Sequence, residues 1–320
     1  MKTYLITGGA GFIGTNLTKE LLELGNKVIV LDNFNDYYDS SIKENNIKEF
    51  LDNPNYKIYK GDIRNIFDIK EVLDNNNVDV IIHLAALVGV RSSLSNSYEY
   101  NHTNVDGTII ILDEAKIHDI KNVIIASSSS VYGNNQIPFT EDMETNNIIS
   151  PYAKTKRECE KIAHEYHDKY NINIICLRFF SVYGPHQRPD EAIHKFVDLM
   201  YQDKTIPLYG DGTSTRDYTY VGDIVDGIIK SSDYLFNNDD VYDVLNLGSS
   251  SSISLNKLID ILSDELKIKP HIANYPIQPG DVNHTKADIT KAYKLIGYKP
   301  KYKIEDGIRN FIKAYKDEHR

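Results

Sequence analysis

Short β-branched runs alternate with longer amphipathic stretches through the first 180 residues, and this alternation restricts the chain to few folds. A strand, a helix and a second strand in succession form a parallel pair with the helix packed on one face. The sequence therefore predicts an α/β protein, with a Rossmann-type doubly wound parallel sheet that helices cover on both faces. The expected strands are residues 4–7, 27–31, 57–60, 78–83, 122–126 and 173–179, and the expected helices are residues 12–24, 66–73, 97–117 and 152–170.

Prolines and glycines separate shorter elements after residue 180, which indicates a second unit. We expect residues 1–180 to form the first domain and residues 181–320 a smaller C-terminal α/β lobe. A predicted helix at 221–233 and a predicted strand at 244–247 are expected to return to the main sheet, so 221–247 belongs with the first domain. Apolar residues at helical spacing from Ile304 to Tyr315 predict a packed terminal helix.

The composition narrows the possible partners. The net charge is −10 and the pI about 5.5, so the chain lacks the basic patch of a nucleic-acid-binding protein. Cys159 and Cys176, the two cysteines, are expected to be ordinary buried residues. The N-terminus does not resemble a signal peptide, and no apolar run reaches the roughly 18 residues that a membrane span needs. We therefore expect a cytoplasmic protein without a membrane partner.

A glycine-rich loop follows the first predicted strand and opens the first predicted helix. Gly8, Gly11 and Gly14 form a G-x-x-G-x-x-G pattern, in which missing Cβ atoms allow a tight turn. Such a turn brings a pyrophosphate to the free N–H groups at the helix N-terminus. Asp32 ends the second strand, 18 residues after Gly14, where its carboxylate can accept hydrogen bonds from both ribose hydroxyls and repel a 2′-phosphate. The pattern therefore predicts a dinucleotide site that favours NAD over NADP.

Two further segments are expected at the same site. Asp62 follows the third strand and is expected to meet the adenine. Leu84, Ala85 and Ala86 follow the fourth strand and are expected to form a flat apolar wall beside the cofactor.

A hydroxyl-rich strand end and a Tyr-x-x-x-Lys pair indicate the chemistry. Residues 127–130 are four serines, and Tyr152 and Lys156 lie one helical turn apart on the next helix. Ser150 and Pro151 are suited to the N-cap and the first turn of that helix, so its dipole favours an anionic Tyr152. Lowering the pKa of a tyrosine by about three units needs roughly 4 kcal/mol of anion stabilisation. Lys156 and the oxidised nicotinamide ring are the expected sources, and Ser128 is expected to share the sugar hydroxyl's proton. This pattern indicates hydride chemistry on an alcohol.

These motifs make the chain similar to extended short-chain dehydrogenases/reductases, and specifically to nucleotide-sugar 4-epimerases, over nearly its whole length. The resemblance also rests on later motifs at residues 178–180, 182–185, 209–212, 216–218, 221–224 and 279–281. It implies catalytic roles for Ser128, Tyr152 and Lys156, a tightly bound NAD, and a UDP-sugar held by the C-terminal lobe. The NAD-binding residues that it implies are Gly8, Gly11, Phe12, Ile13, Gly14, Asp32, Asn33, Asp62, Ile63, Leu84, Ala85, Ala86, Asn104, Tyr152, Lys156 and Phe179.

The resemblance also implies how the UDP-sugar is bound. The arginine that matches Arg216 binds the UDP pyrophosphate, for which a bidentate guanidinium is suited, and the segment around Tyr209 packs on uracil. The implied substrate-binding residues are Ser128, Ser129, Ser181, Arg188, Tyr209, Arg216, Asp281 and Thr285.

The sugar remains open between two classes. Thr285 matches the position whose bulk limits the sugar pocket, and a threonine leaves room for an N-acetyl or a carboxylate substituent. Ser181 and the segment 180–196 resemble UDP-glucuronate 4-epimerases, in which Arg188 would contact the carboxylate. His186 stands where that group often has arginine, and the segment 284–288 resembles the N-acetylhexosamine epimerases. A UDP-glucose 4-epimerase is a further alternative.

Other functions are less well supported by the residues. A nucleotide-sugar dehydratase or decarboxylase would need an acid and a base just after the serine strand, where this chain has Ser129 and Ser130. A non-catalytic NAD sensor would need neither Tyr152 nor Lys156.

The helix surfaces carry two further expectations. Glu160, His164 and His167 share a helix face, which we expect to be solvated rather than to bind a metal. Relatives pair the helices 97–117 and 152–170 across a homodimer, in which Val105, Ile109 and Leu112 would either line the interface or face the sheet.

Overall fold

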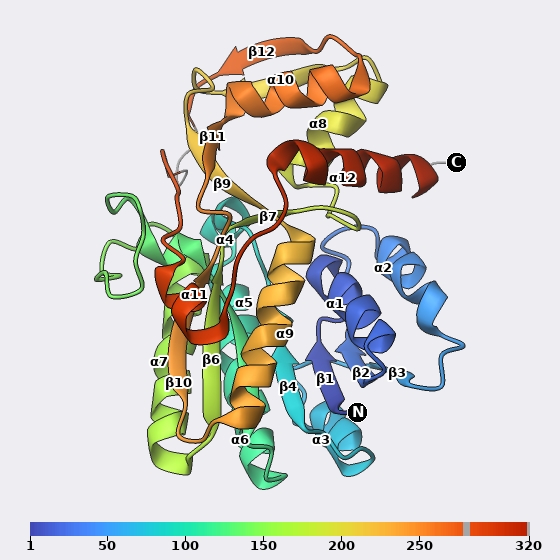
Figure 1. Ribbon diagram of the computed structural model, residues 1–320, viewed down its shortest axis with the longest axis vertical. Helices are drawn as coiled ribbons and strands as arrows, with labels where there is room; N and C mark the ends of the chain where they lie inside the picture. The colour runs from blue at the N-terminus through green and yellow to red at the C-terminus, as the bar shows by residue number, and fades with distance from the viewer. Residues whose placement is uncertain (278–281, 319–320) are drawn as a thin grey trace.

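The computed structural model describes residues 1–277 and 282–318, and a seven-stranded parallel sheet forms its centre (Figure 1). The strand order is β10-β6-β5-β4-β1-β2-β3, with every neighbouring pair parallel. This order is that of a doubly wound Rossmann sheet with one added strand, as predicted. The strands are β1 (Thr3–Thr7), β2 (Lys27–Asp32), β3 (Tyr56–Lys60), β4 (Val80–His83), β5 (Asn122–Ser128), β6 (Asn173–Phe179) and β10 (Tyr242–Leu247).

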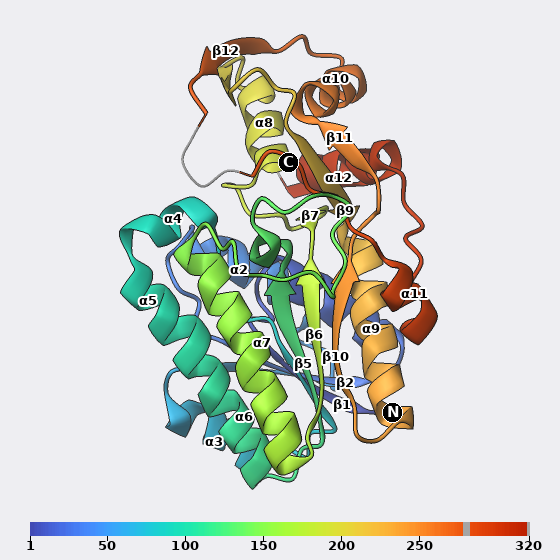
Figure 2. The same cartoon turned by 90° about the vertical axis from the view of Figure 1, so that its left-hand side faces the viewer.

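Helices cover both faces of this sheet because successive strand residues point to opposite sides (Figure 2). Tyr4 and Ile6 of β1 pack with α1 (Phe12–Glu23) and α9 (Val221–Asn237). Leu5, between them, packs with α3 (Ile66–Asp74), α6 (Gly107–Ile117) and α7 (Pro151–Tyr170). The sheet is therefore buried on both faces, which explains why its strands read as continuous apolar runs.

The segment 221–247 contributes α9 and β10 to the main sheet and its cover. Strand β10 pairs with β6 in parallel, with Leu247 opposite Phe179, and α9 packs against the same face as α1. Helix α11 (Thr290–Ile296) lies over β10 (Figure 2).

The remaining C-terminal elements gather beyond the carboxyl ends of the strands (Figure 1). Strands β7 (Ser181–Tyr183), β9 (Thr215–Tyr220) and β11 (Ser252–Ser254) form one small sheet, and β8 (Thr205–Tyr209) and β12 (His271–Tyr275) form another. Helices α8 (Ala192–Tyr201), α10 (Leu255–Leu266) and α12 (Ile304–Glu318) complete this part. The predicted apolar face of the terminal helix is buried at Ile308, Phe311, Ile312 and Tyr315.

The helix predicted at 97–117 is interrupted. It consists of α5 (Ser97–Asn101), a π-helical turn (His102–Asp106) and α6. Asn104, in the π turn, bonds both backbone groups of Leu87 and the hydroxyl of Thr155. π turns occur frequently at functional sites. Here the π turn directs Asn104 toward the loop that follows β4. Val105 and Leu112 are buried against the sheet side of this helix.

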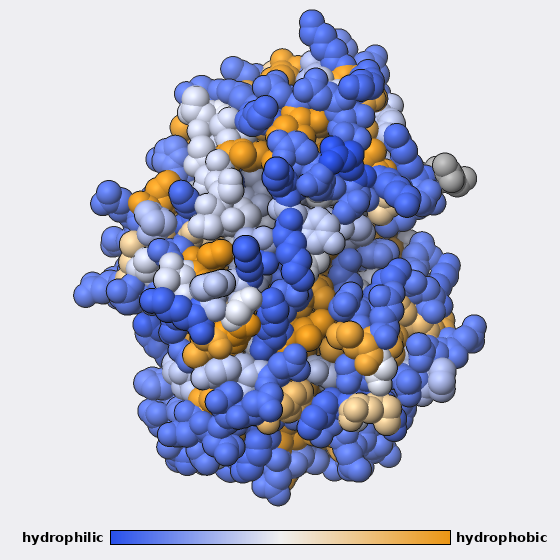
Figure 3. Space-filling model, in the orientation of Figure 1, coloured by the Kyte–Doolittle hydropathy of each residue, from blue (hydrophilic) through white to orange (hydrophobic). Residues whose placement is uncertain are grey.

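Exposed large apolar side chains include Phe67, Tyr98 and Ile117. Most of the face in Figure 3 is hydrophilic, with small apolar groups scattered over it. Within residues 1–277 and 282–318, no helix combines the length and the apolar character that crossing a membrane requires.

A buried histidine at the end of β4, His83, connects β1 with α6. His83 Nδ1 lies 2.7 Å from the hydroxyl of Thr7, and Nε2 lies 3.1 Å from that of Thr108. The Thr7 hydroxyl accepts from Ala85 N–H, so its own proton is available for Nδ1 of the ring. The Thr108 hydroxyl donates its proton to the Asn104 carbonyl oxygen, so it can only accept from Nε2. Only a neutral imidazole can accept at Nδ1 and donate at Nε2. Burial lowers the pKa of His83 to about 3, and Lys156 acts in the same direction.

We predict that His83 makes stability fall with acidity. Its folded pKa of about 3 lies below the ordinary value of 6.5, so between these values the unfolded chain binds a proton that the folded protein does not. The free energy of unfolding should therefore drop by up to about 1.4 kcal/mol per pH unit from this residue as pH falls below about 6.5. Urea denaturation at a series of pH values from 7 to 5 gives the free energy of unfolding at each pH. This free energy should fall less steeply with decreasing pH in His83→Gln than in the wild type. The same pH dependence in both proteins would contradict the assignment, because all other titrating groups are common to both proteins.

Candidate active site

One cavity of about 460 Å³ opens at the carboxyl ends of β1, β2, β4, β5 and β6. This is where ligands bind in doubly wound sheets, because the connections diverge to opposite faces there. Most of the residues predicted at the site line it: Gly8, Gly11, Phe12, Ile13, Gly14, Asp32, Asn33, Ile63, Leu84, Ala85, Ala86, Ser128, Ser129, Tyr152, Lys156, Phe179, Ser181 and Arg188.

The glycine loop leaves room where a side chain would block it. Gly8 has a φ of +73°, and a Cβ there would lie 2.8 Å from the backbone nitrogen of Ala85. A Cβ on Gly14 would lie 2.5 Å from the carbonyl oxygen of Gly8. Helix α1 begins after Gly11 with no side chain capping its first N–H groups. Uncapped N–H groups at a helix N-terminus favour an anion, so the loop fits a pyrophosphate.

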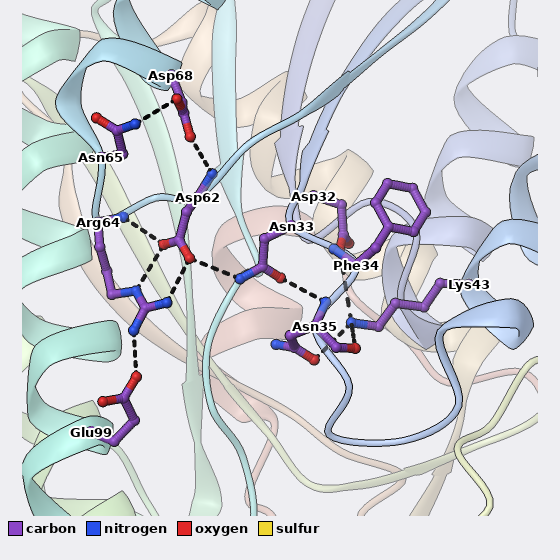
Figure 4. Close-up of polar contacts among 10 residues, drawn as sticks. All are labelled: Asp32, Asn33, Phe34, Asn35, Lys43, Asp62, Arg64, Asn65, Asp68 and Glu99. Carbon is purple, nitrogen blue, oxygen red and sulfur yellow. Dashed lines mark hydrogen bonds and ion pairs between the residues drawn. The ribbon is translucent and has the colours of Figure 1, made fainter.

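Asp32 is held at the edge of the cavity, as a ribose-binding carboxylate requires (Figure 4). Its oxygens accept from the N–H groups of Ala10 at 3.2 Å and Phe34 at 2.9 Å. Lys43, from α2 (Ser40–Ile47), is buried 3.8 Å away and also donates to Asn35. The position of Asp32 fits the predicted ribose contact, and Lys43 offsets part of its charge.

Asp62 is turned toward protein partners (Figure 4). Its carboxylate pairs with Arg64 through hydrogen bonds of 2.7 and 2.9 Å and accepts from Asn33 at 3.0 Å. Arg64 also pairs with Glu99. The hydrogen bonds with Arg64 lower the pKa of Asp62 to about 2. Asp62 is therefore ionised, but its neighbours Gly61 and Ile63, rather than its carboxylate, line the cavity.

The residues predicted to be catalytic lie on β5 and α7. Ser150 caps α7 by accepting from Ala153 N–H, with Pro151 in the first turn, as the sequence predicts. Tyr152 faces the cavity one turn before Lys156, whose ammonium donates to the carbonyl oxygen of Ala126 at 2.7 Å.

Ser128 is oriented by its neighbour. Ser130 donates both its N–H and its hydroxyl to Ser128 Oγ, at 3.2 and 2.9 Å. With both lone pairs engaged, Ser128 has its own proton available to donate into the cavity, where Tyr152 lies. Burial raises the pKa of Tyr152 above 10, and the hydrogen bond with Ser128 opposes that rise. Burial lowers the pKa of Lys156. The protein alone therefore keeps Tyr152 neutral, and the expected lowering of its pKa depends on added positive charge.

A charged group lies at the side of the cavity nearest the C-terminal lobe. Arg188 lines it and forms a two-point ion pair with Asp190, at 2.8 and 2.9 Å, and a contact with Glu191 at 3.0 Å. Glu191 also lines the cavity, and burial raises its pKa. Arg188 further lies over the ring of Tyr37. Two carboxylates thus share one guanidinium beside the position of Tyr152.

Several predicted residues lie outside the cavity lining. Asn104 is buried behind it and acts on the loop backbone at Leu87. Tyr209 packs on Tyr275 and under Arg91, and Arg216 donates to the carbonyl oxygens of Thr215 and Asn283. Thr285 is buried, and its hydroxyl accepts from Asp217 N–H. Asp281 lies outside the described residues.

The sequence analysis missed several residues that line the cavity. Lys43 and Glu191 had no recognisable signal, because a charged residue in a short helix or loop usually faces solvent. Tyr37 and Tyr38 also line the cavity but were not assigned to the site. The other missed lining residues are Leu31, Asn35, Gly61, Leu87, Val88, Gly89, Val90, Thr103, Ala126, Ser127, Ser130, Phe180 and Val182.

The predicted solvated face of α7 is partly wrong. His164 stacks on Tyr242, and His167 lies near Asp240. Glu160, however, is buried at 1% exposure and pairs with Arg178. Helical spacing shows that Glu160, His164 and His167 share a face. It does not show that Glu160 has an oppositely charged partner on the sheet, so the prediction was wrong for Glu160.

A doubly wound sheet, a glycine-rich first turn and a Tyr-x-x-x-Lys pair in one cavity define an extended short-chain dehydrogenase/reductase. The chain belongs to the family described as GDP-mannose 4,6 dehydratase, which matches residues 5–311.

Named relatives align over the whole chain. It is 38% identical to a UDP-glucuronate 4-epimerase of Thermodesulfobacterium geofontis, over 99% of this chain and 97% of the relative. The solved UDP-glucuronic acid 4-epimerase from Bacillus cereus, in complex with UDP-glucuronic acid and NAD, superposes with a TM-score of 0.92 at 33% identity over 99% of each chain. A UDP-N-acetylglucosamine 4-epimerase from Methanobrevibacter ruminantium, in complex with UDP-N-acetylmuramic acid, gives 0.89 at 31% identity, also over 99% of each.

We predict that Gly8→Ala weakens NAD binding by at least about tenfold, because the added methyl would force the glycine loop away from Ala85. Gly25→Ala is the matched control: its φ is +77°, but no atom lies within 4 Å of the new Cβ. Both variants carry similar backbone strain, and only one crowds the cavity. Calorimetric titration of apoprotein with NAD measures the difference, and equal losses in the two variants would contradict the prediction.

Proposed function

We propose that the protein catalyses NAD-dependent C4 epimerisation of a UDP-hexose through a 4-keto sugar. The observation that carries the proposal is the convergence of Tyr152, Ser128 and Lys156 on the cavity that also contains the glycine loop and Asp32. The named relatives support it, because UDP-sugar 4-epimerases align with both the sheet and the C-terminal lobe.

The residues divide the work of the reaction. The glycine loop and Asp32 would hold NAD, which would supply a reversible hydride acceptor for C4 and positive charge near Tyr152. Tyr152 removes the proton of the C4 hydroxyl and later returns it, while Ser128 donates a hydrogen bond to the same oxygen. Lys156 stabilises the phenolate from the same helix face. Epimerisation needs the sugar to turn over, so the lobe must hold UDP firmly and the sugar loosely.

The C-terminal lobe supplies the UDP site in this proposal. Arg216 would bind the pyrophosphate and Tyr209 would pack on uracil, with Asp281 and Thr285 as further substrate-binding residues. We further propose that residues 181–220 and 248–320 form this substrate lobe, with 1–180 and 221–247 forming the NAD domain.

Two sugar classes remain compatible with the cavity: UDP-N-acetylglucosamine/UDP-N-acetylgalactosamine and UDP-glucuronate/UDP-galacturonate. Arg188 is the group able to bind a sugar carboxylate, but it already pairs with Asp190 and Glu191. A uronate would therefore have to displace one of these carboxylates, whereas an acetamido group would not.

A dehydratase reaction is disfavoured despite the family's description. Elimination of water needs an acid and a base beside the sugar, and the residues after Ser128 that line the cavity are Ser129 and Ser130. Product mass separates the two reactions, because epimerisation conserves mass and dehydration removes water.

We also propose that the protein is a cytoplasmic homodimer that pairs through α5, α6 and α7. Sedimentation analysis of the purified protein tests the dimer. Val105 and Leu112 face the sheet in the structure, so other residues of these helices would form the interface.

We predict that Tyr152→Phe lowers turnover by at least about a thousandfold while leaving UDP-sugar affinity nearly unchanged, because only the proton transfer is lost. Turnover is measured by chromatography of products from UDP-glucose, UDP-N-acetylglucosamine and UDP-glucuronate. Unchanged turnover would rule out the assigned base, and failure of the wild type to convert any of these sugars would rule out the proposed function.

We predict that Arg188→Leu separates the two sugar classes. If the substrate is a uronate, kcat/KM for UDP-glucuronate should fall at least about thirtyfold, since a charge-assisted hydrogen bond contributes roughly 2 kcal/mol. Turnover of UDP-N-acetylglucosamine should change several-fold at most. Equal losses for both sugars would mean that Arg188 shapes the cavity but does not bind a carboxylate.

A further inference from the structure

Three residues of α7, each one turn apart, face the last three residues of β5. Tyr152 faces the cavity beside Ser128, Lys156 donates to the carbonyl oxygen of Ala126, and Glu160 accepts from the hydroxyl of Ser127 at 2.6 Å. The first two contacts belong to the catalytic group already described. The third lies directly behind it and has no part in the reaction as stated.

Glu160 is fully engaged and shielded from water. Arg178, opposite Ser127 in the register of β5 and β6, donates to its two oxygens at 2.8 Å each. Glu160 and Arg178 are 1% and 3% exposed. The carboxylate therefore ties the helix to two neighbouring strands at the level of Ser127.

Arg178 extends the connection away from the cavity. Its guanidinium lies over the ring of Tyr132, 4.7 Å from the centroid, and Tyr132 donates to Asn246 at 2.7 Å. Asn246 in turn donates to the carbonyl oxygens of Phe139 and Asp288. The charged pair is thus fixed from both sides.

Stability alone does not explain a charged pair at this place. Apolar residues of similar size can replace a buried ion pair without loss of stability, because removing two charges from water is costly. An ion pair does fix geometry, because its two parallel hydrogen bonds can form only when the helix and the strand lie in one register.

Glu160 also affects the charge on Lys156. The titratable groups that interact with Lys156 in the described residues come from α7, β6 and β4: Cys159, Glu160, Cys176 and His83. Burial raises the pKa of both thiols and lowers that of His83, so these three are neutral at neutral pH. Glu160 is the anion among them, and it opposes the effect of burial on the pKa of Lys156.

We propose that Glu160, paired with Arg178, is a positioning residue for the epimerisation: it fixes the end of β5 against α7, and so sets Ser128 and Lys156 against Tyr152 and favours the charged form of Lys156. This inference rests on the proposed function for its kinetic consequence, but not for its effect on Lys156.

The test compares Glu160→Gln and Ser127→Ala with Glu114→Gln. Glu114 is a second fully buried glutamate, on α6 and paired with Lys70 and His118, far from the catalytic group. Ser127→Ala removes one hydrogen bond and keeps the ion pair, so it serves even if Glu160→Gln does not fold. Each variant is characterised by thermal unfolding, by UDP affinity, by kcat and KM, and by the pH dependence of Lys156 acetylation with trace acetic anhydride, read by mass spectrometry.

We expect Glu160→Gln to lower kcat by about thirtyfold or more and Ser127→Ala by about threefold to tenfold, with KM and UDP affinity within about twofold. The acetylation midpoint of Lys156 should fall to lower pH in Glu160→Gln, because the neighbouring anion is lost. Glu114→Gln should keep the wild-type kcat and midpoint.

Folded Glu160→Gln and Ser127→Ala with wild-type kcat would overturn the proposal, as would an unchanged Lys156 midpoint in Glu160→Gln. If Glu160→Gln does not fold, a wild-type kcat in Ser127→Ala overturns it. If the wild type converts no UDP-sugar, the proposed function fails, and the Lys156 midpoint in folded Glu160→Gln still decides whether Glu160 acts on the lysine.

Discussion

The site depends on how a buried ammonium group is satisfied. Lys156 projects from α7 into the interior and donates to the backbone carbonyl of Ala126, at the end of the central strand β5. An unpaired buried charge would cost several kcal/mol, so the helix is stable only in a register that provides this acceptor. The same register places Tyr152 at the cavity and Ser128 beside it. The geometry of the reacting group therefore follows from the pairing of one cation.

The cavity itself follows from the topology of the sheet. Strands β1 and β4 are neighbours, but the connections that leave their carboxyl ends run to opposite faces, so the chain parts between them. The glycine loop fills one side of this opening and the loop from Leu84 to Ala86 the other. Arg188 and Glu191, which follow β7, also line this cavity. The cavity is thus built from segments that are far apart in the sequence.

Local patterns made much of this predictable. The glycine spacing, Asp32 at a strand end, and the Ser150–Pro151 start of the helix depend on residues that are close in sequence. Their geometry is dictated by turns, caps and helical periodicity, which act over a few residues. The glycine turn before α1 and the start of α7 could be predicted for that reason. The interruption of the helix 97–117 could not be predicted. Asn104, in the π turn, bonds to Leu87 and Thr155, and these contacts join segments that are distant in the sequence.

The class of fold, the dinucleotide loop and the pairing of a tyrosine with a lysine on one helix face follow from sequence patterns alone. Which charged side chains turn inward depends on contacts between distant segments. Glu160 looked like a solvated residue until Arg178, from the next strand, provided its counter-charge. Lys43 lies at the cavity beside Asp32, and Glu191 lies there paired with Arg188. Burial of a charge depends on a partner distant in the chain, and no periodicity in the sequence records where that partner will be.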